Sequence, residues 1–134
     1  MSEDAEIVYV HAEGAAPPAG HYSQAVKHAG VIYVATQLPK SPAGNVLPTD
    51  PIEKQLEQAL KNADDILRAG GSDLSRSLLI TLFISDIELW SRANAAYAAV
   101  LGEHKPARSV VPTGPLHLGY QIAVQVIAAT TAPR

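Results

Sequence analysis

The residue best suited to bind a small ligand is Arg108, which follows Pro106-Ala107 and precedes a short apolar segment. A planar guanidinium can pair with a carboxylate through two parallel hydrogen bonds, so an arginine between a proline corner and a strand suits recognition of a small carboxylate. An arginine in such a position more often forms a surface or interface ion pair. Taken alone, Arg108 indicates a candidate carboxylate site that needs support from other residues.

Tyr22 is the second candidate, because it follows Ala19-Gly20-His21 and opens a predicted strand. A tyrosine after a glycine-containing loop could present its hydroxyl to a pocket. The more common role is a packing aromatic whose hydroxyl lies at the surface, and the residue alone favours that role. We interpret the next two residues, Ser23 and Gln24, as hairpin surface.

Gln37 and Asn94 are amides in positions that allow either a binding or a structural role. Gln37 stands where a strand enters a loop, so its amide could bind a ligand or cap backbone groups. Asn94 lies inside a predicted helix, where a buried asparagine could hold a loop carbonyl and an exposed one would be ordinary. On the same helix, Glu88 and Arg92 are four residues apart, which predicts a routine helix ion pair.

The sequence predicts no metal site. It contains no cysteine, which excludes disulfides, thiolate nucleophiles and zinc sites built on cysteine. No two histidines have a metal-ligand spacing such as HxH or HExxH, and the GxSxG, P-loop and GxGxxG patterns are absent. The five histidines, each more often a surface residue than a catalyst, are His11, His21, His28, His104 and His117.

Apolar spacing predicts the elements that position these residues. The clearest is a helix that follows the proline-rich loop at residues 39–51: Asp50 can cap it, Pro51 fits its first position, and Glu53 stands three residues after the cap. Gly70-Gly71 ends it. Its apolar residues recur on one face, which consists of Ile52, Leu56, Ala59, Leu60, Ala63, Ile66 and Leu67.

A second helix is predicted from Asp86, its candidate cap, to about Leu101. Strands are predicted at residues 7–10, 78–84, 109–111 and 121–128, and a hairpin joins residues 24–28 to 31–35 through Ala29-Gly30. This order indicates an α+β fold, with one mixed sheet, two helices on one face and an opposite face that a second subunit could cover. The expected inner face of the second helix is Leu89, Trp90, Ala93, Tyr97 and Val100.

Length and charge limit the class of protein. The 134 residues fit a single domain spanning residues 1–134. A net charge of -3 provides no general basic surface, so we expect no nucleic-acid partner. The acidic start, MSEDAE, lacks the parts of a secretion signal, and no apolar run approaches the ~20 residues of a membrane span. We therefore expect a cytoplasmic protein, and the low charged fraction of 17% suggests an oligomer.

Six short motifs, in order, resemble those of the Rid family, also called YjgF-like or L-PSP endoribonuclease. Residues 19–26, AGHYSQAV, resemble the family's GPYSQAV, and residues 32–39, IYVATQLP, resemble VFVSGQIP. The predicted helix at residues 52–71 is similar to QALENLKAVLEAAG, and residues 81–86, TLFISD, are similar to TVFLTD. Residues 94–97, NAAY, and 106–109, PARS, resemble MNEVY and PARS, so the resemblance covers about residues 17–129.

The resemblance implies a chorismate-mutase-like fold and a homotrimer with clefts between its subunits. It also implies hydrolysis of reactive enamines and imines, such as 2-aminoacrylate, to 2-keto acids and ammonia, with no cofactor and no metal. Arg108 would pair with the carboxylate of a 2-imino acid and so position its imine carbon for attack by water. Tyr22 would assist from the cleft wall, Asn94 would shape the site, and Thr36, Gln37 and Gln125 would contact the substrate.

The sequence departs from the family pattern at residues that bear on the chemistry. Ala35 replaces the serine of SGQIP, although Thr36 offers a hydroxyl beside it, and His21 replaces the proline before the tyrosine. The last strand, IEIEAIA in the family, has Ala123 and Gln125 in place of both glutamates, the first of which is proposed to activate water. General acid–base help is typically worth about 10²–10⁴ in rate, so this loss matters for turnover.

Two main functions therefore stay open. The first is an imine hydrolase in which positioning by Arg108 suffices, with Gln125, His21 or Thr36 as a substitute for the missing glutamate. The second is a trimer that binds a small carboxylate or another metabolite with little turnover, which the loss of both glutamates favours. A ribonuclease is a third alternative, disfavoured because the chain is acidic and lacks a paired acid and base.

Overall fold

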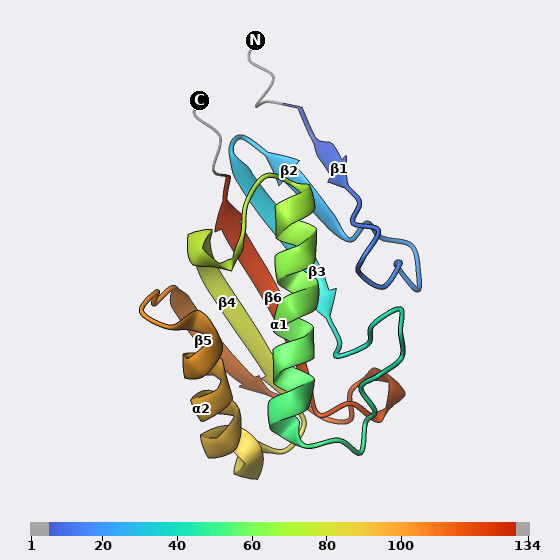
Figure 1. The fold of residues 1–134 in the computed structure, drawn as a ribbon, viewed down its shortest axis with the longest axis vertical. Helices are drawn as coiled ribbons and strands as arrows, with labels where there is room; N and C mark the ends of the chain where they lie inside the picture. Colours follow the sequence, from blue (N-terminus) through green and yellow to red (C-terminus); the bar gives the residue numbers. More distant parts are fainter. Residues whose placement is uncertain (1–5, 131–134) are drawn as a thin grey trace.

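A computed structural model describes residues 6–130 as one six-stranded mixed sheet with two helices on one face (Figure 1). The strand order is β1-β2-β3-β6-β4-β5, and every neighbouring pair is antiparallel except β4 and β5. The predicted α+β class is confirmed. The strands are β1 (Val8–Val10), β2 (Ala25–His28), β3 (Val31–Gln37), β4 (Ser77–Ile84), β5 (Ala107–Pro112) and β6 (Ile122–Ala129), and the helices are α1 (Ile52–Ala69) and α2 (Trp90–Leu101).

Helix α1 covers the middle of the sheet with the apolar face that its sequence predicts. All seven residues of that face are at most 1% exposed, and they pack on β3 and β6. The prediction for its cap is wrong: Pro51 occupies the cap position, and no side chain caps the helix. The Asp50 carboxylate instead accepts a hydrogen bond from the backbone N–H of Leu47 and pairs with Lys54. At the other end, Gly70 is needed because a Cβ there would lie 2.8 Å from a methyl group of Ile32.

Strands β2 and β3 form the predicted hairpin. Ala29 and Gly30 have φ angles of 53° and 81°, as a two-residue turn of type I′ requires. Strand β3 extends two residues beyond the predicted end, to Gln37, and its register with β6 shifts between Val34 and Gln37. This irregularity lies where the chain leaves the sheet toward the loop before α1.

Helix α2 covers the β5 edge of the same face. Asp86 caps a short 3-10 turn at Ile87–Leu89 by accepting from the N–H of Glu88, and α2 itself begins at Trp90. Of the predicted inner face, Ala93 and Tyr97 are buried, but Val100 is 40% exposed, and Ala96 packs in its place. The predicted Glu88–Arg92 pair is not present: Arg92 of α2 instead forms a two-bond ion pair with Glu53 of α1.

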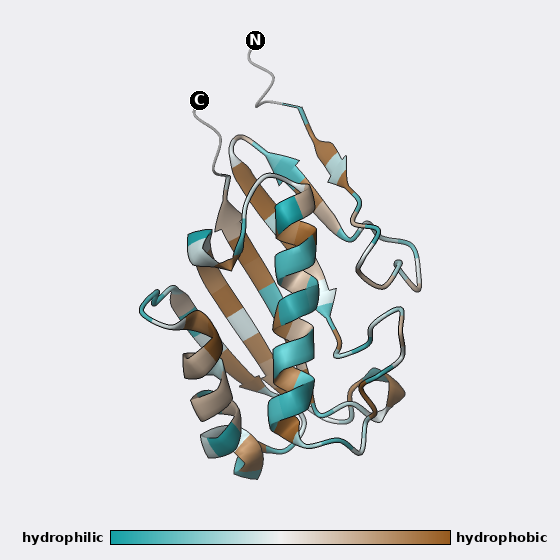
Figure 2. Ribbon diagram, viewed as in Figure 1, coloured by the Kyte–Doolittle hydropathy of each residue, from teal (hydrophilic) through white to brown (hydrophobic). Residues whose placement is uncertain are grey.

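The opposite face of the sheet is uncovered in the single chain. Residues of β3 and β6 alternate between the two faces, so that Ile32 and Val126 are buried under α1 while Tyr33 and Gln125 point away from it. Figure 2 shows hydrophobic strands behind α1, whose outer surface is hydrophilic. Tyr33 is 45% exposed and Tyr9 of β1 is 73% exposed, which is unusual for tyrosines on a sheet. None of the described helices combines the length and apolar composition needed to cross a membrane.

Candidate functional site

Arg108 is held flat between aromatic rings of α2. Strand β5 pairs in parallel with β4 so that Arg108 lies beside the buried Ile80, and its side chain therefore points toward the helices. Its guanidinium carbon lies 4.9 Å from the ring centroid of Trp90 and 5.0 Å from that of Tyr97. The Nη1 group donates a 2.8 Å hydrogen bond to Oδ1 of Asn94. Because these three α2 residues are spaced i, i+4 and i+7, one face of the helix holds the arginine.

The charge of Arg108 has no acidic partner among residues 6–130. Neutral groups surround it instead: two aromatic faces, each typically worth about 0.5–2 kcal/mol to a cation, and one amide oxygen. A guanidinium has five N–H donors, and Asn94 engages only one edge. The remaining donors and the whole charge are available to an anionic ligand, which distinguishes Arg108 from the ion-paired Arg68 and Arg92.

A hollow lies next to Arg108, between the end of α2 and the start of β5. Its volume is about 380 Å³, and Arg108, Tyr97, His104 and Lys105 line it. The Tyr97 hydroxyl is buried and has no hydrogen-bond partner among the described residues. Burial raises the pKa of Tyr97, with the charge of Arg108 acting in the opposite direction, so this hydroxyl stays protonated at neutral pH.

Tyr22 lies on the uncovered face, where it borders three adjoining hollows. Its side chain is 52% exposed, and its hydroxyl oxygen accepts a 3.2 Å hydrogen bond from the backbone N–H of Ala19. That bond uses a lone pair and leaves the phenolic proton available to donate. Tyr22 therefore borders open space on this face of the sheet, and its role in a substrate cleft stays a prediction.

Gln24, two residues later, is not at the hairpin surface as predicted. It is 2% exposed, and its amide bonds the backbone N–H and carbonyl of Ala12 and the carbonyl of Ala16. These three bonds fix the loop that precedes Tyr22. The sequence carries no period that would distinguish this buried amide from a surface one.

The two candidates that follow β3 differ in role. Thr36 is exposed and lines two of the Tyr22 hollows. Gln37 lines one of them, but it is buried and its amide donates to the carbonyl of Ala35 at 3.0 Å. Of the two roles considered for Gln37, the structure shows the backbone cap, which uses one N–H of the amide and leaves its other N–H and its oxygen.

The two β6 positions that lack glutamate lie on the same uncovered face. Ala123 forms part of a hollow of about 520 Å³ together with Tyr22 and Thr36. Gln125 is exposed and borders the neighbouring hollow with Tyr22 and Tyr33. The departures from the family pattern thus converge on the region around Tyr22.

The candidate residues fall into two groups that a single chain does not join. Arg108 and Asn94 lie under α2, on the helix side of the sheet edge, and Tyr22, Thr36, Gln37 and Gln125 lie around the uncovered face. The hollow at Arg108 shares no lining residue with those at Tyr22. Among the described residues, no three His, Asp or Glu side chains gather as a metal site would require.

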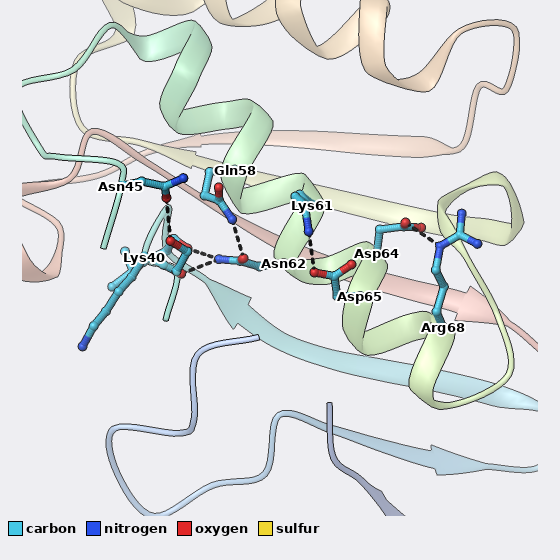
Figure 3. A network of polar contacts seen from close by, with 10 residues as sticks. Lys40, Asn45, Gln58, Lys61, Asn62, Asp64, Asp65 and Arg68 are labelled. Carbon is cyan, nitrogen blue, oxygen red and sulfur yellow. Dashed lines mark hydrogen bonds and ion pairs between the residues drawn. The ribbon is translucent and has the colours of Figure 1, made fainter. Parts of the chain in front are cut away.

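Two buried amides of α1, which sequence reasoning missed, hold the loop between β3 and α1. Asn62 donates to the carbonyls of Leu38 and Lys40 at 3.0 and 2.6 Å (Figure 3). Gln55 donates to the carbonyls of Pro48 and Asp50 and accepts from the N–H of Gln121. Leu38 and Lys40 line a Tyr22 hollow, so these amides support the site. Gln55 lies four residues before Ala59, and Asn62 lies four residues before Ile66, so both amides lie on the apolar stripe of α1. That position is a signal that could have found them.

Comparisons with known proteins agree with this architecture. The family model described as endoribonuclease L-PSP matches residues 13–130. Protein HMF1 of Saccharomyces cerevisiae is 35% identical over 117 residues, which cover 87% of this chain and 90% of the yeast protein. A RutC family protein of Pyrococcus horikoshii is 33% identical over 123 residues, which cover 92% of this chain and 96% of that protein.

A solved structure gives the same result for the fold. The crystal structure of YyfA from Yersinia pestis, described as a protein of unknown function of the conserved Rid protein family, has a TM-score of 0.87 to this chain. The two chains are 33% identical, and the match covers 93% of this chain and 100% of the Yersinia pestis chain.

Proposed function

Because this chain belongs to the endoribonuclease L-PSP family, the Rid family that its motifs resemble, we propose that it hydrolyses a small 2-imino acid to a 2-keto acid and ammonia. The observation that carries this proposal is Arg108, a guanidinium without an acidic partner among residues 6–130, held by two aromatic rings and one amide. A carboxylate fits the free edge of such a group through two parallel hydrogen bonds. The bound carboxylate holds the adjacent planar imine carbon in place, and that carbon is the atom that water attacks.

We further propose that the site is completed between two copies of the chain in a homotrimer. The Arg108 group lies at the β5 edge and the Tyr22 group lies on the uncovered face, with no hollow residue in common. A cyclic oligomer brings two different surfaces of neighbouring copies together, so each interface can join one group of each kind. The exposed Tyr9 and Tyr33 on the uncovered face support burial by another copy.

In the proposed cleft, positioning provides much of the rate. Arg108 fixes the carboxylate, and a water molecule held by the Tyr22 and Thr36 hydroxyls attacks the imine carbon from the facing surface. The C=N electron pair moves to nitrogen, which takes a proton, and the resulting carbinolamine loses ammonia to give the keto acid. Gln125 borders the adjoining hollow and contacts the rest of the substrate.

The test is ammonia and pyruvate release from 2-aminoacrylate, generated in situ, by the wild type and by Arg108→Ala. We expect Arg108→Ala to lower kcat/KM by about 10²-fold or more, since a charge-assisted pair of hydrogen bonds contributes roughly 3 kcal/mol. Arg92→Ala is the matched control, because it removes an arginine of the same region that pairs with Glu53. Acceleration by the wild type that persists in Arg108→Ala, or no acceleration by a well-folded wild type, would contradict the proposal.

A second function is a trimer that binds a small carboxylate or another metabolite without turnover. The observation that favours it is Ala123, whose methyl group lines the Tyr22 hollow and cannot transfer a proton. Titration calorimetry with a 2-keto acid separates the two functions: binding lost in Arg108→Ala, together with no ammonia release by the wild type, would establish the second. The absence of a nucleic-acid partner and the cytoplasmic location stay predictions from the sequence.

A further inference from the structure

His117 borders the same space as Tyr22, although no motif or spacing selects it among the five histidines. It lies in the short 3-10 turn His117–Gly119 that leads into β6. Its side chain lines two adjoining hollows of about 140 and 520 Å³. Tyr22, Thr36 and Leu38 line both hollows as well, so the two form adjoining parts of one cleft with His117 on its rim.

The backbone around His117 is fixed in an uncommon conformation. Leu118 has a φ angle of 63°, in the left-handed region that residues with a branched side chain rarely adopt. The turn continues through Gly119, with a φ angle of 81°, into Tyr120, whose buried hydroxyl donates to the carbonyl of Val46 at 2.8 Å. Backbone outliers of this kind concentrate at functional sites, where surrounding contacts hold them. Here they hold the imidazole at the cleft.

The imidazole of His117 is uncommitted. Among residues 6–130 its ring makes no hydrogen bond or ion pair, whereas His104 bonds the carbonyl of Ser77. The titratable groups that share its hollows are Tyr22 and Lys40, and no carboxylate lines either hollow. A neutral imidazole with a free ring nitrogen can accept a proton from water.

We propose that His117 is the proton-transfer group of the imine hydrolysis, acting in the cleft where Ala123 provides no acidic side chain. This inference rests on the proposed function and on its cleft between subunits. Ala123 lines the same hollow as His117, so an acidic side chain on β6 and an imidazole on the preceding turn would reach the same water. His117 thus provides the proton transfer that a glutamate at position 123 would provide in the family pattern.

The imidazole of His117 can accept and return every proton that the proposed reaction moves. As the oxygen of water bonds to the imine carbon, its proton passes to the free ring nitrogen of His117, and the C=N π pair becomes a lone pair on nitrogen. The imidazolium returns that proton to the former imine nitrogen, which gives the carbinolamine. A proton then passes from the hydroxyl to the amine through the same imidazole. The C–N bond breaks with its electron pair on the departing ammonia, and the oxygen pair forms the keto group.

The test compares His117→Gln with the double variant His117→Gln/Ala123→Glu in the ammonia-release assay. We expect the single variant to lose about 10²-fold or more in kcat, in the range for general acid–base catalysis, with KM little changed. The double variant should recover most of that loss, because its carboxylate lies in the same hollow. His28→Gln, at the end of β2 and outside the cleft, is the matched control and should keep the wild-type rate.

The pH profile gives a second readout. The wild-type rate should rise with pH along a limb that is absent in His117→Gln and returns, at a different pH, in the double variant with glutamate. Tyr22→Phe should keep the limb, which separates His117 from the phenol. A full rate in His117→Gln, in a protein whose activity still depends on Arg108, would overturn this inference and leave the proposed function standing. An inactive wild type would overturn both.

Discussion

At the scale of single residues, the contacts of Arg108 differ from those of the other described arginines. Arg68 and Arg92 pair with Asp64 and Glu53, and Arg76 donates to the carbonyl of Thr130. Arg108 is held by Trp90, Tyr97 and Asn94, which orient the guanidinium without neutralising it. Lysine could not replace it, because an ammonium group neither stacks as a plane nor pairs through two parallel bonds.

Asn94→Asp tests whether binding depends on the uncharged contacts that Trp90, Tyr97 and Asn94 make with Arg108. The new carboxylate would keep the shape of the amide and accept the same 2.8 Å bond from Arg108, but it would also neutralise the guanidinium. We expect KM for the imino acid to rise about tenfold or more, a change of about 1.4 kcal/mol in binding, with a smaller effect on kcat.

Asn94→Ala is the control for that change. It removes the hydrogen bond without adding a charge, so its KM should lie between those of the wild type and Asn94→Asp. A lower KM for Asn94→Asp than for Asn94→Ala, measured on folded proteins, would show that the lack of charge on the side chains around Arg108 has no role in binding.

Side-chain type alone makes Arg108 and Tyr22 candidates and favours a packing role for Tyr22, whereas Thr36 comes from the family resemblance; all three line hollows in the structure. Side-chain type did not predict the roles of the amides. Gln24, Gln37, Gln55 and Asn62 all bond backbone groups of loops, and such bonds depend on where distant segments pack. The position of Gln55 on the apolar stripe of α1 could have indicated its burial, whereas no pattern around Gln24 reveals its backbone partners.

At the scale of elements, the sequence predicted α1 more completely than α2. Helix α1 has a continuous apolar stripe, and every residue of that stripe is buried. Helix α2 is rich in alanine and lies at the sheet edge, so its apolar residues outnumber the positions that can be buried. Val100 was assigned to the core and is 40% exposed, while Ala96, on the same helix, is 8% exposed. Periodicity cannot choose between faces when most residues of a helix are apolar.

The two helices are joined by the ion pair of Glu53 and Arg92, which gives a pH-dependent prediction. The hydrogen bond from Arg92 lowers the pKa of Glu53 from its ordinary 4.5 to about 2. A carboxyl whose pKa is lower in the folded state stabilises the fold above its ordinary pKa, and this contribution disappears as pH falls toward the folded value. Glu53→Gln should therefore unfold at a lower urea concentration than the wild type at pH 7, and the difference should shrink between pH 4.5 and about 2.

Glu88→Gln is the matched control, because Glu88 stands four residues before Arg92 and would be the partner in an ordinary helix pair. It should leave the urea midpoint at pH 7 nearly unchanged. Equal effects of the two substitutions, or a larger effect of Glu88→Gln, would mean that Arg92 does not join α2 to α1 in solution.

At the scale of the whole molecule, one chain presents two separate groups of candidate site residues. The Arg108 group lies next to α2, and the Tyr22 group borders hollows on the sheet face opposite the helices. Figure 1 shows both helices on one face of the sheet. Through the family motifs, the sequence predicts that both groups belong to one site, and this stays a prediction. The sequence could not show that the two groups lie apart in one chain, because their separation depends on the strand order β3-β6-β4-β5.

The most direct measurement of this division is complementation between two inactive variants. Arg108→Ala removes the carboxylate anchor, and Thr36→Trp fills the hollow that Tyr22 lines. Each variant alone, and a chain that carries both substitutions, should release no ammonia from 2-aminoacrylate above the uncatalysed rate. Co-expressed Arg108→Ala and Thr36→Trp chains should form mixed oligomers with partial activity, because some interfaces join an intact Arg108 to an open hollow. Mixed oligomers that form but remain inactive, beside an active wild type, would contradict a site shared between subunits.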